Sequence, residues 1–266
     1  MVETIILLYH DIDSPDHPSE KEDLATFETV VRLNEFEHQM AGLAEDGWNV
    51  LSMGRYLEKL QLGSVNSKDI VLTFDDGHYS NYKFAFPILQ QYGFTATFFI
   101  IADRIETPFY MNPAALQELA AADMEIASHG LTHTFLPLLA MREIHRELEE
   151  SKTVLEQVTG HPVHSFAYPG GHFDGRVLHC LQDSGYEAAA SCIVGFNTVA
   201  TDWFRLRRVE IRRGTSIDDF KNALTRKNIL FYQGVDSVKR MVKKSVGLAR
   251  YRKLRQKMYC LYPFKR

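Results

Sequence analysis

Short apolar runs alternate with amphipathic segments along most of the chain. The clearest run is 70–74, which is rich in β-branched and aromatic residues and stops abruptly at Asp75-Asp76-Gly77. A run of this length and composition predicts a buried strand. By the same pattern, further strands are expected at 4–9, 48–53, 96–101, 125–127, 165–168, 187–191 and 205–211.

The segments between these runs show helical spacing and residues that end helices. Four apolar residues between positions 36 and 44 fall on one helical face after a candidate cap at Asn34. The segment 80–92 predicts a helix that bends or restarts at Pro87 and ends at Gly93. Further helices are expected at 56–60, 113–122, 142–158, 177–182 and 216–224. Strands and helices alternate, which predicts an α/β fold with a parallel sheet or barrel.

The totals fit a globular protein without a membrane span. The chain has 266 residues, of which 45% are hydrophobic and 24% are charged, and it lacks a continuous apolar run of the ~18 residues that a spanning helix needs. No basic, apolar signal sequence is recognisable at the start, so we expect a cytoplasmic protein. The three cysteines have no CxxC spacing, which favours free thiols.

The charge distribution divides the chain into an acidic body, 1–236, and a basic tail, 237–266. The tail holds 11 Lys and Arg and no Asp or Glu, although the whole chain has a net charge of −4. Apolar residues are interleaved with these cations, so much of the tail is expected to form a basic amphipathic helix. Such a helix suits peripheral contact with an anionic membrane, here the inner membrane, or packing on the body with a solvated basic face. The acidic body argues against nucleic acid as a partner.

Polar residues follow four of the predicted strands directly: His10-Asp11, Asp75-Asp76, His129 and Tyr168-Pro169. In parallel barrels, the carboxyl ends of the strands meet on one face and carry the chemistry. We therefore expect these four strand ends to converge.

His129 and His133 are four residues apart and can reach one metal ion. The pair alone is a weak signal, and two acids at a strand end can simply be solvated. With a carboxylate from Asp75 or Asp76, however, the set gives two imidazoles and one oxygen, which leaves positions open for water and substrate. Successive side chains at a strand end diverge, so one acid can bind metal while its neighbour binds a proton.

These residues also carry a family resemblance. Thr-Phe-Asp-Asp-Gly at 73–77 together with Ser-His-Gly-Leu-Thr-His at 128–133 resembles the NodB-type polysaccharide deacetylases, carbohydrate esterase family 4. The resemblance extends over roughly residues 4–225. It implies a distorted (β/α) barrel of about seven parallel strands and hydrolysis of N-acetyl groups on amino sugars. The substrate would be a polysaccharide or, as membrane contact through the basic tail would suit, its lipid-linked precursor.

The resemblance also implies residue roles. Asp75 would be the general base, and Asp76, His129 and His133 would hold a divalent metal, most often zinc, with nickel, cobalt or iron as alternatives. The loop at Tyr168, Pro169 and Gly170 would bind substrate, with a backbone N–H meeting the oxyanion.

The chain departs from the common family pattern in two places. No histidine follows His179, where the family usually has a Leu-x-His acid, but His10 ends the first strand. This arrangement resembles the permuted exopolysaccharide (poly-N-acetylglucosamine) deacetylase subgroup and implies that His10 is the general acid. Ala167 stands where many members have an arginine that orients the base. Arg208 is a candidate replacement, although its place on an edge strand favours a surface position.

Two other functions remain open from the sequence. The same site could deformylate a lipid-linked sugar or cleave another amide, and the departures above would also fit a carbohydrate-binding barrel without catalysis. The intact set of Asp75, Asp76, His129 and His133 opposes the second alternative, because a binding module needs no base beside a metal.

Overall fold

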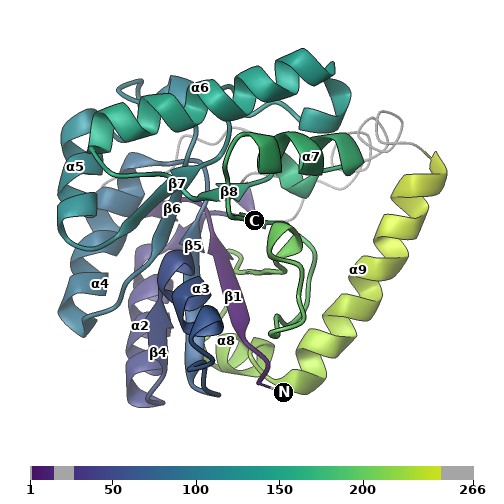
Figure 1. Ribbon diagram of the computed structural model, residues 1–266. Coiled ribbons are helices and arrows are strands. Elements are labelled where there is room, and N and C mark those ends of the chain that lie inside the picture. Colours follow the sequence, from purple (N-terminus) through teal and green to yellow (C-terminus); the bar gives the residue numbers. More distant parts are fainter. Residues whose placement is uncertain (1, 15–26, 247–266) are drawn as a thin grey trace.

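The computed structural model describes residues 2–14 and 27–246. Within them, one eight-stranded sheet forms the centre of the molecule, and all of its strand pairs are parallel. Its order is β10-β1-β5-β6-β7-β8-β9, with β4 also paired to β5 (Figure 1). The strands are β1 (Ile5–Tyr9), β4 (Asn49–Leu51), β5 (Asp69–Phe74), β6 (Thr97–Ile100), β7 (Glu125–Ser128), β8 (Ser165–Ala167), β9 (Ala188–Ala190) and β10 (Val209–Glu210). A separate pair joins β2 (Ile12–Asp13) to β3 (Val31–Arg32).

The sheet curls into a half-barrel whose two edges are linked by the residues that lead into β10. Leu206 donates its N–H to the Ala189 carbonyl at 3.0 Å, and Arg208 donates its N–H to the Ile193 carbonyl at 2.9 Å. These bonds carry the chain from the β9 edge to β10, which pairs with β1. The expected distorted (β/α) barrel of about seven parallel strands is therefore confirmed.

Helices cover the outer face of the curled sheet (Figure 1). They are α2 (Leu33–Glu45), α3 (Met53–Gln61), α4 (Phe86–Tyr92), α5 (Pro113–Ala121), α6 (Met141–Thr159), α7 (Gly175–Asp183) and α8 (Ile217–Ala223). The last helix, α9 (Arg226–Val246), lies apart from them along one edge of the molecule. The predicted helix over 80–92 consists of a π-helical turn, Asn81–Ala85, followed by α4. Gly93 ends α4 with a φ of 65°, as a left-handed cap requires.

Several boundaries differ from the sequence prediction by one to four residues, and two of these differences have a clear local cause. Helix α2 begins at Leu33, before the expected cap Asn34, because the Arg32 N–H is bonded to the Glu35 carboxylate at 3.1 Å. The strand expected over 205–211 shortens to β10, because Trp203–Arg205 forms a 3₁₀ turn.

Strands β1 and β5 are buried along their whole lengths, and they carry His10 and Asp75 at their carboxyl ends. Aromatic rings hold these strands in place. The Phe74 ring stacks on Phe98 with centroids 4.9 Å apart, and the Tyr9 hydroxyl donates to Gln39 of α2 at 2.7 Å. The two site-bearing strands are thus fixed from the side of the core.

The last described helix, α9, runs without a break through the boundary expected between 236 and 237. Residues 247–266, most of the predicted tail, lie outside the described residues, as do residues 15–26. None of the helices in the described part of the chain is long and apolar enough to cross a membrane. The division into 1–236 and 237–266 stays a prediction.

Candidate active site

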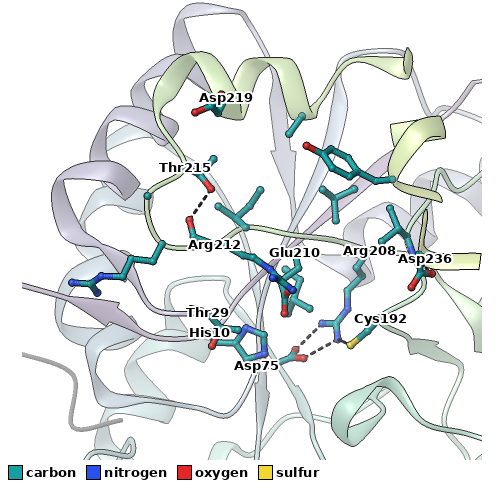
Figure 2. Close-up of a pocket in the computed structure, with 18 of the residues that line it drawn as sticks. His10, Thr29, Asp75, Cys192, Arg208, Glu210, Arg212, Thr215, Asp219 and Asp236 are labelled. Atoms are coloured by element: carbon teal, nitrogen blue, oxygen red, sulfur yellow. Dashed lines mark hydrogen bonds and ion pairs between the residues drawn. The ribbon is translucent and has the colours of Figure 1, made fainter. Parts of the chain in front are cut away.

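The strand ends converge, as the sequence predicts, around a cleft of about 1150 Å³. Its lining includes His10, Asp75, Asp76, His129, His133 and Gly170. From this centre the cleft extends along the loop after β10 to α8 and α9, where Asp219, Asn222, Tyr232 and Asp236 line it. Figure 2 shows this extension, with Asp219 and Asp236 far from His10 and Asp75.

Asp76, His129 and His133 place one ligand atom each within 4.8 Å of one another. The Oδ1 atom of Asp76 is 3.6 Å from His129 Nε2 and 3.5 Å from His133 Nε2. Ligand atoms around a tetrahedral zinc at ~2.0–2.1 Å lie about 3.4 Å apart. The donor set and its spacing therefore fit a zinc-sized divalent ion.

Neighbouring groups fix the orientation of these side chains. His129 is buried, and its Nδ1 is 2.8 Å from the Ala167 carbonyl, so Nδ1 carries the proton and Nε2 is left to face Asp76. The other carboxylate oxygen of Asp76, Oδ2, is 3.3 Å from His78 Nε2. The His78 ring in turn stacks on Tyr110 with centroids 4.9 Å apart. In His129 and Asp76, the atoms that face the other two candidate ligands are thus the ones that do not contact these neighbours.

Left-handed backbone brings these side chains inward. Asp76 and His133 have φ values of 75° and 64°, which are uncommon for residues other than glycine. Gly77 follows with a φ of 82°, and a Cβ at this position would lie 3.0 Å from Ile100 Cδ1. Such backbone is retained where the surrounding structure imposes it, and it gathers at functional sites.

Asp75 is clamped by a buried arginine (Figure 2). Arg208 donates from Nη1 to Asp75 Oδ1 and from Nη2 to Oδ2, each at 2.7 Å, and from Nε to the Ser191 carbonyl at 2.9 Å. Burial raises the pKa of the Asp75 carboxyl, but the positive charge of Arg208 and its hydrogen bonds to the carboxylate lower the pKa by more. The net shift is downward, so Asp75 is ionised at neutral pH.

The expectation that Arg208 lies on the surface is wrong, since the residue is 1% exposed. Its neighbour Arg207 is partly exposed. The two arginines differ in that the side chain of Arg208, the residue directly before β10, points inward. Arg208 is the candidate replacement for the arginine that many family members have at the position of Ala167. It contacts Asp75 directly.

His10 lies beside Asp75 at the end of β1, and Figure 2 shows its ring directed toward that carboxylate. His10 is partly buried and lines the cleft. The charge of His10 contributes to the lowered pKa of Asp75, which agrees with this proximity.

The predicted substrate loop contributes less than expected. The Tyr168 side chain is fully buried, donates its hydroxyl to the Phe204 carbonyl at 2.8 Å and stacks on Phe173, so it does not face the cleft. Burial raises its pKa strongly. Pro169 is buried too. Gly170 alone of the three lines the cleft, with a φ of 61°.

Glu147 of α6 is a further site residue, and the sequence reasoning missed it. Its carboxylate is 7% exposed and accepts the N–H groups of Leu131 and Thr132, each at 2.9 Å, and the Thr132 hydroxyl at 2.6 Å. These residues form the turn between His129 and His133. In the sequence, Glu147 is one of several acids in a charged helix. The only signal that distinguishes it is its position on the helical face that points to the core.

Known proteins resemble this chain in both sequence and fold. The sequence model of the polysaccharide deacetylase family matches residues 63–189, which include both motifs but neither His10 nor Arg208. YxkH of Bacillus subtilis (strain 168), assigned as a polysaccharide deacetylase, is 27% identical over 212 residues, or 79% of this chain and 72% of YxkH.

A second sequence relative and a crystal structure agree with this assignment. The poly-β-1,6-N-acetyl-D-glucosamine N-deacetylase of Escherichia coli (strain K12) is 24% identical over 71% of this chain and 35% of that enzyme. The structure of BC0361, a polysaccharide deacetylase from Bacillus cereus, is 27% identical and superimposes with a TM-score of 0.74 over 84% of this chain and 69% of BC0361. Residues 63–189 therefore carry a polysaccharide deacetylase domain of the NodB type, a family of hydrolases that act on N-acetyl amides.

Proposed function

We propose that this protein is a metal-dependent N-deacetylase of a poly-N-acetylglucosamine type of glycan or of its lipid-linked precursor. One observation carries the proposal: Asp76, His129 and His133 converge within 4.8 Å beside Asp75, which Arg208 holds by both oxygens. This arrangement supports a divalent-ion site and a separate, ionised base in the same cleft.

Asp76, His129 and His133 would hold the ion. Zinc suits two imidazoles and one carboxylate, and nickel, cobalt or iron are alternatives for the same donors. When bound, a divalent ion supplies Lewis-acid polarisation of the acetamide carbonyl and lowers the pKa of water.

Asp75 is assigned as the general base. Its carboxylate accepts the proton of the attacking water, and Arg208 prevents it from rotating away. Because Arg208 lowers the pKa of Asp75, the carboxylate is ionised at neutral pH and can accept a proton, but it is a weaker base than an ordinary carboxylate.

His10 is assigned as the general acid. The departing amine must be protonated, since an amide anion is a very poor leaving group. His10 lies beside Asp75 at the end of the adjacent strand, so both proposed proton-transfer groups could act on the same amide bond of the substrate. The oxyanion would accept a hydrogen bond from the loop at Gly170, which lines the cleft. The donor would be a backbone N–H, because the Tyr168 side chain lies in the core and cannot reach the cleft.

The proposed substrate class is supported by the candidate acid on the first strand and by the named activity of the Escherichia coli relative. A lipid-linked precursor would suit a cytoplasmic enzyme held at the inner membrane by its basic tail. Deformylation of a lipid-linked sugar uses the same groups and is the second candidate. A binding barrel without catalysis is opposed by Asp75, whose bidentate clamp has no purpose in glycan binding alone.

The test is acetate release from N-acetylglucosamine oligomers by the metal-loaded protein, with Asp75→Asn as the control. We expect acetate from the wild type and a loss of at least about 100-fold in kcat for the variant. Formate release from N-formylated sugars without acetate would favour the second candidate. Binding of the oligomers without either product would overturn the proposal.

A further inference from the structure

The outward face of α9 is apolar, which is unusual for a helix at the edge of a soluble domain. Phe231, Val238 and Met241 are 65%, 56% and 63% exposed. With Gly234 they follow the spacing i, i+3, i+7, i+10, so they form one stripe along the helix. We call these four positions the outer stripe of α9.

The side of α9 that faces the body is mostly polar. Ile229 is fully buried there, but the next inward position is Gln233, which lies against Gly195. One turn further, Asp236 accepts the Val194 N–H at 3.3 Å and pairs with Arg240 at 2.6 Å. A helix that packs its polar side inward and exposes its apolar side needs a second partner on the exposed side.

Charge identifies the partner. Residues 226–266 hold 13 basic residues and one acid, Asp236, whereas residues 1–225 carry a net charge of −16. An apolar stripe on a strongly cationic segment suits the surface of an anionic bilayer, where the stripe enters the headgroup boundary and the cations meet lipid phosphates. A symmetric contact between two such helices would bring like charges together.

The same helix forms part of the cleft. Asn228, Tyr232 and Val235 line it from the side of α9 between the outer stripe and the face that packs on the body, and Asp236 lines it from the packed face. Figure 1 shows α9 along one edge of the molecule, apart from the helices that cover the sheet. A bilayer bound to the outer stripe therefore lies next to the rim of the cleft.

We propose that the outer stripe of α9 docks on an anionic membrane surface and presents the cleft to glycans anchored in that membrane. The docking itself is independent of catalysis. The presentation of lipid-anchored substrate rests on the proposed function. The docking element in this proposal is α9 itself. Docking therefore does not rest on residues 247–266 alone.

The experiment is flotation of the full chain with vesicles of phosphatidylcholine and phosphatidylglycerol, and with phosphatidylcholine alone. The test variant is Phe231→Gln/Val238→Gln. The matched control is Leu62→Gln/Leu138→Gln, which removes apolar groups that are 71% and 60% exposed elsewhere on the surface. Acetate release from soluble oligomers is measured for every variant.

We expect the wild type and the control to float with anionic vesicles only, and less at high salt. The α9 variant should partition at least about tenfold more weakly while its activity on soluble oligomers is unchanged. Equal binding by the α9 variant would overturn the proposal, as would the absence of wild-type binding. A dimer or a contact with residues 247–266 that protects the stripe, seen by light scattering and hydrogen exchange, would also overturn it. If no variant releases acetate but the vesicle result holds, the proposed function fails and the docking stands.

Discussion

Arg208 holds both carboxylate oxygens of Asp75, with Nη1–Oδ1 and Nη2–Oδ2 each at 2.7 Å, although the two residues are 133 positions apart in the chain. One arrives at the end of β5 and the other just before β10, and β1 lies between these strands. The curl of the sheet brings them together across β1. Arg208, which directly precedes the edge strand β10, thus orients Asp75, the base of the proposed reaction.

Replacing Arg208 by lysine tests this relationship. Lysine retains the charge but cannot make two parallel hydrogen bonds, so Asp75 should lose its fixed orientation. We expect kcat for acetate release to fall about 10- to 100-fold with little change in KM. The metal content should stay at the wild-type level. Wild-type kcat in Arg208→Lys would show that the clamp serves folding alone.

Arg208→Met should affect stability as well. This change leaves the buried Asp75 carboxylate without its cation, which typically costs about 3–5 kcal/mol of unfolding free energy. Urea unfolding at pH 7 measures the loss. The double variant Arg208→Met/Asp75→Asn removes the unpaired charge and should recover much of the stability, and no recovery would contradict the assignment of an ionised Asp75.

Glu147→Gln tests whether the turn between the two histidines is held by α6. The Glu147 carboxylate accepts three hydrogen bonds from that turn, and a glutamine places an amide among the same donors. We expect the affinity for zinc to fall about 10- to 100-fold, as for other outer-shell partners. Titration calorimetry on apo protein checks this. Glu150→Gln, on the exposed side of the same helix, is the control and should bind zinc as the wild type does.

Asp69 makes stability depend on pH. Burial raises the pKa of this carboxyl, but Lys59 at 2.7 Å, the Asn66 N–H and the Asn49 amide outweigh burial and lower it overall. A lowered folded-state pKa gives stability that is present above the unfolded value of about 3.9 and is lost as the pH falls through the folded value.

Asp69→Asn should therefore be less stable than the wild type at pH 7, and the difference should shrink as the pH drops below about 4. Urea unfolding at a series of pH values measures this. Asp123→Asn removes an exposed ion pair with Arg55 and should change stability little at any pH. A difference between Asp69→Asn and wild type that stays constant down to pH 3 would argue against the assigned pKa direction.

The parts of the fold that the sequence predicts well are those set by local rules. The apolar run of β5, the glycine that ends α4 and the span of α5 are set within a few residues, and each lies where expected. The convergence of Asp76, His129 and His133 follows from one more rule, that parallel strands end on one face. These features require no knowledge of long-range packing.

The features that were missed or misplaced depend on side-chain direction across the tertiary structure. Arg208 and Arg207 are indistinguishable in the sequence, and the register before β10 decides which one is buried. Tyr168 belongs to a motif of the cleft, but its hydroxyl reaches the Phe204 carbonyl behind the strand. Glu147 contacts a turn 15 and 16 residues earlier in the chain, beyond any local pattern.

The most direct measurement of the central claim is the metal content of protein purified without chelators or nickel resin, for wild type and His129→Ala. The three converging ligand atoms predict about one equivalent of a transition metal in the wild type and its loss in the variant. His145→Ala, a change at a histidine of α6 that pairs with Glu149, should retain the metal. No metal in the wild type, even after reconstitution with zinc, would contradict the account.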